Sequence, residues 1–182
     1  MGLLCVTIKN QRPNTAMNLK EKQELIEQAI QLETNVATLY TIFCHAHTEH
    51  AELWSQLSQE EKGHAALIKN ATERCDLNEL LNDEAISANL TKLERCNHHI
   101  QALIEQFAEA PPTSVDAFTI ALDLEQSAGE IHYQQFMDIG DGSILDRVFQ
   151  KLDQEDKAHS ARLRAYMLKH DIPIVGYLER EP

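Results

Sequence analysis

The sequence contains few residues that interrupt helices. Its 182 residues include six glycines and five prolines, and between Pro13 and Pro111 there is no proline and one glycine, Gly63. Proline removes a backbone donor and glycine adds backbone freedom, so both punctuate regular structure. A stretch of this length without them predicts long helices and argues against short strands joined by tight turns. At about 150 residues per domain, the chain suffices for one domain with a buried core.

Basic residues are also scarce. The chain has 16 lysines and arginines against 29 aspartates and glutamates, which gives a net charge of −13. Such a charge balance repels the phosphate backbone of nucleic acids and attracts cations. We therefore expect no nucleic-acid partner and a preference for positively charged ligands.

Clustered cysteines and long apolar runs are missing as well. The four cysteines are too widely spaced for a zinc knuckle or a dense disulfide framework, and this spacing predicts free thiols in a reducing compartment. The apolar run at 3–8 is too short for a signal peptide, and no run reaches the roughly 18 residues of a membrane span. These absences predict a cytoplasmic protein with no membrane partner. The cysteines are Cys5, Cys44, Cys75 and Cys96.

Apolar residues recur at helical spacing along most of the chain, which predicts an all-α fold. We expect an N-terminal arm over 1–18, a helical domain over 19–172 and a C-terminal tail over 173–182. The predicted helices span 19–46, 49–74, 86–109, 114–138 and 144–170.

Polar and helix-breaking residues mark the ends of these helices. Thr48 and Ser114 are available as N-caps of the second and fourth helices. The turn at 140–143, which contains two glycines, separates the last two helices, and Pro173 ends the last one.

Two of the predicted helices are copies of one another. Residues 53–68, LWSQLSQEEKGHAALI, align with residues 148–163, VFQKLDQEDKAHSARL. The helices before them match more loosely, with Glu33 aligned on Glu125. The chain therefore consists of two helical hairpins joined by a long connection that holds an extra helix. Such a duplication predicts a four-helix bundle with a pseudo-two-fold axis.

Each hairpin helix carries a carboxylate in the middle of its apolar stripe. Helical neighbours lie three, four and seven residues apart, and around Glu33 all six such positions are apolar or aromatic. Glu61, Glu125 and Asp156 occupy similar positions in the other three helices. Four buried carboxylates without compensation, at several kcal/mol each, would exceed the roughly 5 to 15 kcal/mol stability of a domain. Positive charge must accompany them, and two divalent cations would balance four carboxylates.

Histidines complete the pattern in the repeated helices. His64 follows Glu61, and His159 follows Asp156, by three residues, so each pair can reach one ion from the same helix face. One Glu from each of two helices, with an acid-x-x-His motif from each of two others, is the ligand pattern of di-iron and di-manganese carboxylate bundles.

On these motifs the sequence resembles the ferritin-like di-iron carboxylate superfamily over about residues 19–170. The pairing of Glu33 with Tyr40, seven residues on, is most similar to the rubrerythrin branch. The resemblance implies a ferritin-like up-down-down-up four-helix bundle with two bound iron ions, or manganese in their place. It makes Tyr40 a catalytic residue beside one metal, and it makes Glu61 and Asp156 candidate bridging ligands. The implied metal ligands are Glu33, Glu61, His64, Glu125, Asp156 and His159.

The sequence departs from the rubrerythrin pattern at several positions. Asp156 is one methylene shorter than the usual Glu, and Glu155 is the alternative ligand in this helix. Ala128 stands where rubrerythrins often have a further Glu, and there is no C-terminal rubredoxin module. Electrons would therefore come from a separate donor protein or from Fe(II). His132 stands where the second repeat would hold its Tyr.

Other polar residues are expected at the surface. Glu60 and Glu155 lie about 100° around their helices from the acid stripe, which predicts solvated charges. His45, His47 and His50 lie near the first hairpin turn and are expected to face solvent.

The resemblance implies a protein that reacts with O₂ or H₂O₂, as a peroxidase, as a ferroxidase or as a hydroxylase of an organic substrate. Two readings from other classes stay open: a non-catalytic metal-binding or structural bundle, and a vestigial bundle that binds a partner. Carboxylate and imidazole ligands suit both iron and manganese. Long amphipathic bundles often dimerise, so a homodimer is compatible with the sequence.

Overall fold

The computed structural model describes residues 18–74, 83–136 and 144–174, with side chains described for 19–74, 90–127 and 144–174. These residues are helical with short connections and no strands, which confirms the all-α class. The predicted arm, the turn at 140–143 and most of the tail lie outside the described residues. The elements are α1 (Asn18–Ala46), the 3₁₀ turn η2 (Thr48–His50), α2 (Ala51–Thr72), α4 (Asp83–Glu109), α5 (Ser114–Phe136) and α6 (Ile144–Lys169).

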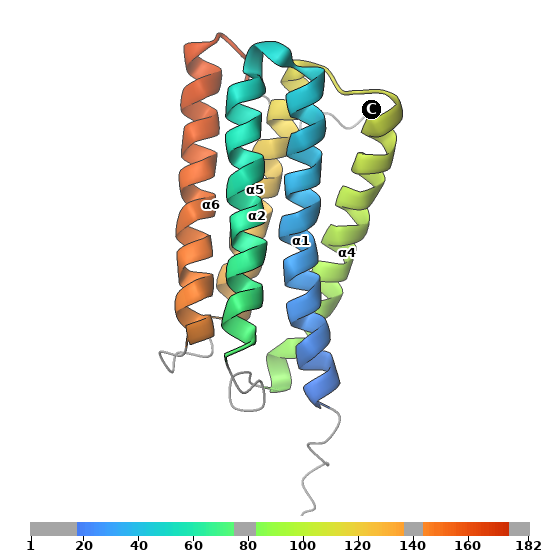
Figure 1. Ribbon diagram of the computed structural model, residues 1–182, viewed down its shortest axis with the longest axis vertical. Helices are drawn as coiled ribbons and strands as arrows, with labels where there is room; N and C mark the ends of the chain where they lie inside the picture. Colours follow the sequence, from blue (N-terminus) through green and yellow to red (C-terminus); the bar gives the residue numbers. More distant parts are fainter. Residues whose placement is uncertain (1–17, 75–82, 137–143, 175–182) are drawn as a thin grey trace, which may run out of the picture.

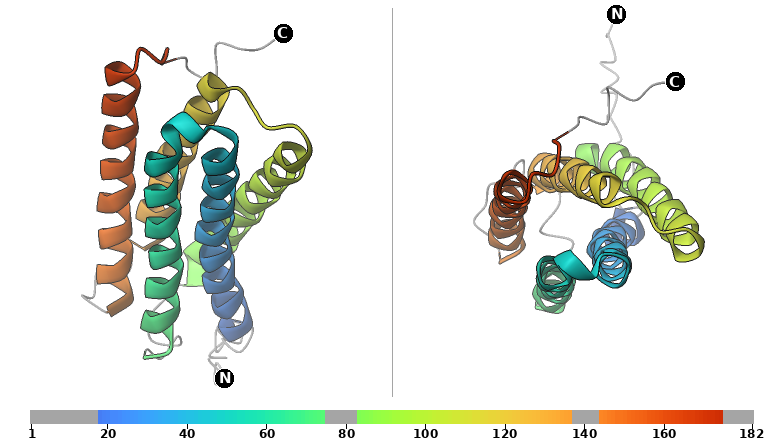
Figure 2. Two further views of the ribbon diagram at one scale, coloured as in Figure 1. Left: turned by 45° about the horizontal axis from the view of Figure 1, so that its top comes forward. Right: turned by 90° about the horizontal axis from the view of Figure 1, so that it is seen from above.

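The five α-helices pack side by side along their lengths (Figure 1). α1 packs against α2 and α4, α5 packs against α6 and α4, and α2 packs against α6. The view from above shows the order α2, α1, α4, α5 and α6 around the molecule (Figure 2). α4, the extra helix of the long connection, therefore lies between α1 and α5. In Figure 1, α1, α4 and α6 run upwards, and α2 and α5 run downwards.

α4 joins the bundle through an apolar seam with a seven-residue repeat. Leu93, Ile100 and Phe107 are buried, and they follow one another at the spacing that keeps side chains on one helix face. The seam also contains a polar contact, because Asn35 of α1 donates a hydrogen bond to Oδ1 of Asn97 at 3.1 Å. Asn97 in turn donates to the backbone carbonyl of Gln28 at 2.9 Å. Buried amides need specific partners, so these bonds set how α4 sits along α1.

Two helix starts differ from the predicted caps. Thr113, not Ser114, caps α5: its hydroxyl accepts a hydrogen bond from the backbone N–H of Asp116 and donates to the Asp116 carboxylate. Thr113 therefore acts as the N-cap residue, and the Asp116 carboxylate holds the orientation of its hydroxyl. At the start of α2, Thr48 opens the 3₁₀ turn, and α2 begins after His50 without a side-chain cap hydrogen bond.

The end of α6 explains how the chain leaves the bundle. Asp171 has a φ of 54°, and the N–H of Ile172 bonds to the carbonyl of Met167 at 2.9 Å. This geometry is a Schellman motif, in which Asp takes the left-handed position that glycine usually fills. Pro173 follows, as the sequence predicts.

Two further predictions concern the cysteines and the length of the apolar stretches. Cys44 and Cys96 are free thiols, as predicted, while Cys5 and Cys75 lie outside the described residues. No described helix carries an apolar stretch long enough to cross a bilayer.

Candidate metal centre

The predicted ligand residues meet in the interior of the bundle. They come from four helices, α1, α2, α5 and α6, and each is buried, with 2–5% of its surface exposed. Two groups each hold ligand atoms within 4.8 Å of one another: Glu33, Glu61 and His64 in one, and Glu61, Asp156 and His159 in the other.

Glu61 belongs to both groups. Its Oε2 accepts a hydrogen bond from Nδ1 of His64 at 2.9 Å, and its Oε1 lies 2.8 Å from Nδ1 of His159. The carboxylate therefore spans the two histidines, one of which comes from its own helix and the other from α6. Glu61 is the residue that links the two halves of the site.

Glu33 and Glu125 lie at corresponding positions in the two halves. An oxygen of Glu33 is 3.4 Å from Nδ1 of His64, and an oxygen of Glu125 is 3.3 Å from Nδ1 of His159. Glu125 also accepts a hydrogen bond from the hydroxyl of Tyr40 at 2.6 Å. Burial, followed by the charge of Glu125, raises the pKa of Tyr40 well above its ordinary value, so this hydroxyl stays protonated and donates. The side chain of His132 is outside the described residues.

Two atoms at the centre test whether the site fits a metal. Oε1 of Glu61 and Nδ1 of His159 are buried, and neither has a well-aligned hydrogen-bond partner among the described residues, although they lie 2.8 Å apart. Buried polar atoms are normally bonded. These two atoms lie close together without the alignment of a hydrogen bond. This arrangement is expected when both atoms point toward a third atom, such as a metal ion between them. The donor set therefore fits a metal ion.

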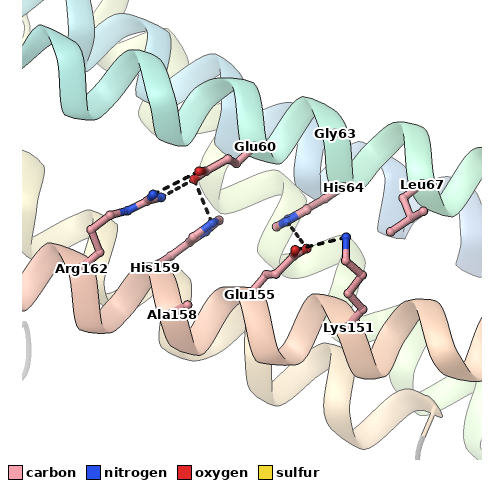
Figure 3. Close-up of a pocket in the computed structure, with 9 residues that line it drawn as sticks. All are labelled: Glu60, Gly63, His64, Leu67, Lys151, Glu155, Ala158, His159 and Arg162. Atoms are coloured by element: carbon pink, nitrogen blue, oxygen red, sulfur yellow. Dashed lines mark hydrogen bonds and ion pairs between the residues drawn. The ribbon is translucent and has the colours of Figure 1, made fainter.

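The outer nitrogens of both histidines contact glutamates of the opposite helix (Figure 3). Nε2 of His64 lies 3.0 Å from Glu155 of α6, and Nε2 of His159 lies 3.2 Å from Glu60 of α2. An acid on the outer nitrogen fixes the ring orientation and directs the other nitrogen inward. The prediction that Glu60 and Glu155 are solvated charges holds only in part, because both side chains are about one third exposed but each also contacts a histidine of the centre. Their signal was present in the repeat, because this glutamate directly precedes the buried acid in both copies.

Each outer glutamate is itself held by a basic residue. Arg162 donates two hydrogen bonds to the Glu60 carboxylate, and Lys151 lies 3.2 Å from Glu155. The bidentate contact with Arg162 lowers the pKa of Glu60 despite partial burial. Both basic residues belong to α6. This helix therefore supplies His159 and also the two side chains that hold the outer glutamates.

The geometry separates Asp156 from Glu155. Asp156 is 2% exposed and belongs to the inner group with Glu61 and His159. The side chain of Glu155 is 36% exposed and contacts the outer nitrogen of His64. The structure therefore places Asp156, and not Glu155, among the atoms that could hold an ion.

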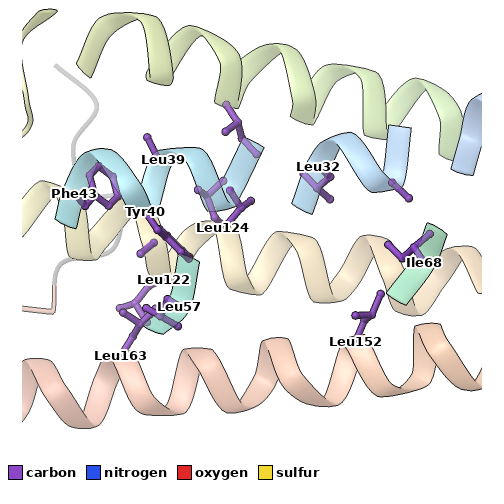
Figure 4. Packing of buried hydrophobic residues seen from close by; sticks show 14 of the residues in the cluster. Leu32, Leu39, Tyr40, Phe43, Leu57, Ile68, Leu122, Leu124, Leu152 and Leu163 are labelled. Atoms are coloured by element: carbon purple, nitrogen blue, oxygen red, sulfur yellow. The ribbon is translucent and has the colours of Figure 1, made fainter. Parts of the chain in front are cut away.

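Apolar layers lie on either side of the centre along the bundle axis. In α2, Glu61 lies between the buried Leu57 and Ile68, and Figure 4 shows Ile68 opposite Leu152 of α6. Toward the other end, Leu57 groups with Leu163 and Tyr40. Such layers keep water out and lower the local dielectric, which strengthens every charge interaction at the centre.

Protons already offset part of the buried negative charge. Burial lowers the pKa of His64, but the hydrogen bonds and charges of Glu33 and Glu61 outweigh this effect and raise the pKa to about 11. At His159 burial also lowers the pKa, but the hydrogen bonds and charges of Glu125 and Glu61 outweigh this effect and raise the pKa to about 10. Without metal, both rings are therefore charged at neutral pH. Metal ions bind the deprotonated nitrogen, so metal binding at these nitrogens displaces protons.

His50, Tyr166 and Phe118 form an aromatic cluster that the sequence did not predict, in which Phe118 is buried and the other two are partly buried. His50, expected at the surface, accepts or donates a hydrogen bond with the hydroxyl of Tyr166 at 3.2 Å and packs edge-on against Phe118. Burial lowers the pKa of His50. His47 is also buried, whereas His45 is exposed as predicted. The contacts of His50 reach α5 and α6, so no spacing within its own segment indicates them.

No protein-family model, no curated protein and no solved structure matches this chain. The geometry of the centre therefore carries the functional proposal.

Proposed function

We propose that the chain is a di-iron carboxylate protein of the ferritin-like type that reacts with O₂ or H₂O₂. Manganese in one or both positions is compatible with the same ligands. The metal ligands are Glu33, Glu61, His64, Glu125, Asp156 and His159. The directions of α1, α2, α5 and α6 in Figure 1 support the ferritin-like arrangement.

One observation carries this proposal: two histidines from different helices place Nδ1 at 2.9 Å and 2.8 Å from opposite oxygens of the same buried carboxylate, Glu61. A simple ion pair between Glu61 and one histidine would need only one of these two contacts. A carboxylate with a nitrogen donor at each oxygen, and a further carboxylate beside each nitrogen, matches two neighbouring ions joined by a shared ligand.

The chain's own residues have distinct roles in this proposal. Glu61 belongs to both groups and would be a ligand shared by two ions, while Glu33 and Glu125, each beside one histidine, would hold one ion each. Tyr40 holds the Glu125 carboxylate through its hydrogen bond of 2.6 Å. Glu60 and Glu155 hold the outer nitrogens of the histidines, and the apolar layers exclude water. Bound iron would supply the change of oxidation state that lets the protein reduce O₂ or H₂O₂.

Metal analysis of the chain, purified without chelators, tests the proposal. We expect about two transition-metal ions per chain, by the ligand count of such bundles. Added Fe(II) should be oxidised rapidly in air and give a ferric absorption band. The double variant His64→Ala/His159→Ala should lose both properties, and wild-type stoichiometry in that variant would remove the assignment.

A non-catalytic metal-binding or structural bundle is the second candidate, because the inner acids already have ion-pair partners: Glu33 and Glu61 contact His64, and Glu125 contacts His159. Two imidazolium rings offset two of the four buried carboxylates, and burial raises the pKa of Glu125 toward its neutral form. The interior therefore has a protonated state that needs no metal. Metal binding with no Fe(II) oxidation would support this candidate over the first.

A further inference from the structure

The candidate centre is closed to solvent, so an ion needs a route to it. Its six residues are each 2–5% exposed. A buried metal site must be reached from outside the fold. A cavity of about 450 Å³ lies between α2 and α6, and it ends on the rings of His64 and His159 (Figure 3).

Small residues leave this cavity open on both of its helices. Gly63 of α2 and Ala158 of α6 line it, and they occupy the same position of the repeat, directly before each histidine. A Cβ atom added to Gly63 would have no neighbour within 4 Å, so a side chain there would project into open space. A larger residue at either position would therefore add bulk to the lining of the cavity without replacing any inner ligand.

The charged groups of the cavity become more buried toward the centre. The side chain of Lys151 is 57% exposed, those of Glu155, Glu60 and Arg162 are 36%, 35% and 32% exposed, and those of both histidines are 6% exposed. The two glutamates are therefore the first carboxylates that an incoming cation meets, and each already contacts a histidine that faces the centre. The two rings lie nearly parallel, 5.4 Å apart between centroids, across the inner end of the cavity.

We propose that this cavity is the port through which a divalent metal ion enters the centre, and that Gly63 and Ala158 keep it open. Glu60 and Glu155 supply oxygen ligands that replace part of the hydration shell before the ion passes the histidines. This inference rests on the proposed function, because it needs a metal that occupies the centre.

Stopped-flow uptake of Co²⁺ by the full metal-free chain tests the port, with the visible absorption of bound Co²⁺ as the signal. Gly63→Leu and Ala158→Leu should each slow uptake about tenfold or more. Release should slow by the same factor, because a port serves both directions, so the Kd and the stoichiometry should stay at the wild-type values. Gln59→Leu places the same side chain on an exposed position of α2 outside the cavity and should leave both rates unchanged.

The outcomes separate the port from the proposed function. Wild-type uptake rates in a folded leucine variant would overturn the port and leave the metal centre standing. A raised Kd with an unchanged uptake rate would also overturn it, because that pattern indicates damage to the ligands. A wild-type chain that binds no Co²⁺ would overturn the proposed function and the port together. Circular dichroism identifies folded variants, and since the two positions lie on different helices, one folded variant decides the question.

Discussion

At the scale of single residues, neighbouring acids on α6 have opposite surroundings. Asp156 faces the interior with Glu61 and His159, whereas Glu155 contacts the outer nitrogen of His64. A helix turns by about 100° per residue, so one step in sequence moves a side chain from the core to the rim. The same separation holds for Glu61 and Glu60 on α2.

This difference predicts distinct metal-binding defects. Asp156→Ala should lose about one of two ions, because it removes an inner ligand, and Asp156→Glu should keep both. Glu155→Ala should keep both ions but bind one of them about 10 to 100-fold more weakly, as expected when a supporting acid is removed. Isothermal titration of each variant with Mn²⁺ measures both quantities. Two intact sites in Asp156→Ala would contradict the assignment.

The histidines predict how the stability of the metal-free chain depends on pH. The folded pKa values of His64 and His159, about 11 and about 10, lie above the ordinary value of 6.5. Their contribution is therefore complete below pH 6.5 and is lost as the pH rises toward the folded values. Between about pH 7 and pH 8.5 the free energy of unfolding should therefore fall as the pH rises, because the unfolded histidines lose protons that the folded ones keep.

Urea unfolding of the metal-free chain across this range provides the measurement. His64→Gln/His159→Gln should flatten the slope, while His99→Gln, at an exposed position of α4, should not. A wild-type stability that is constant or rises across the range would show that the rings are uncharged in the folded chain.

At the scale of the helices, α4 is the element without a counterpart in the repeat. It lies between α1 and α5, which also supply Tyr40 and Glu125 to the centre. Its apolar seam would allow other registers, because leucine, isoleucine and phenylalanine pack without directional bonds. The hydrogen bond between Asn35 and Asn97 is directional and selects one register.

A double-mutant cycle tests this role. Asn97→Ala should cost about 2 kcal/mol, because it leaves the buried Nδ2 donor of Asn35 without its acceptor. Asn35→Ala/Asn97→Ala should cost less than the two single variants together, with a coupling energy of about 1 kcal/mol. Urea denaturation gives each value, and Gln101→Ala on the exposed face of α4 serves as the control. Additive costs would show that the contact does not select the register.

At the scale of the whole molecule, the candidate centre joins the two hairpins. α1 and α2 supply Glu33, Glu61 and His64, and α5 and α6 supply the other predicted ligands. The two hairpins pack directly against each other mainly through α2 and α6. α4 connects them elsewhere, because it packs against both α1 and α5. Bound metal would therefore add bonds where the two halves meet.

Metal should accordingly stabilise the complete fold. A ligand that binds only the folded state at 100 times its Kd adds about 2.7 kcal/mol per site, which raises the Tm of a chain of this size by about 5 °C or more. Scanning calorimetry with and without Mn²⁺ measures the shift, and His64→Ala/His159→Ala should show none. Equal Tm values for the wild-type chain with and without metal would contradict a metal centre shared by four helices.

Local periodicity was sufficient to predict the helices and the faces they bury. The 3.6-residue period is a local property of the backbone, so the spacing of apolar residues was enough to predict five helices and to place Glu33, Glu61, Glu125 and Asp156 on inward stripes. The three-residue step from each acid to its histidine is equally local, and the structure brings Glu61 with His64, and Asp156 with His159, into the same groups.

The contacts between helices could not be predicted from local patterns. The outer bonds of His64 to Glu155 and of His159 to Glu60, the bond of Tyr40 to Glu125, and the place of α4 between α1 and α5 all join distant segments. Periodicity predicts which way a side chain points from its own helix. The rotation and axial position of the neighbouring helix, set by packing of the whole core, decide what that side chain meets.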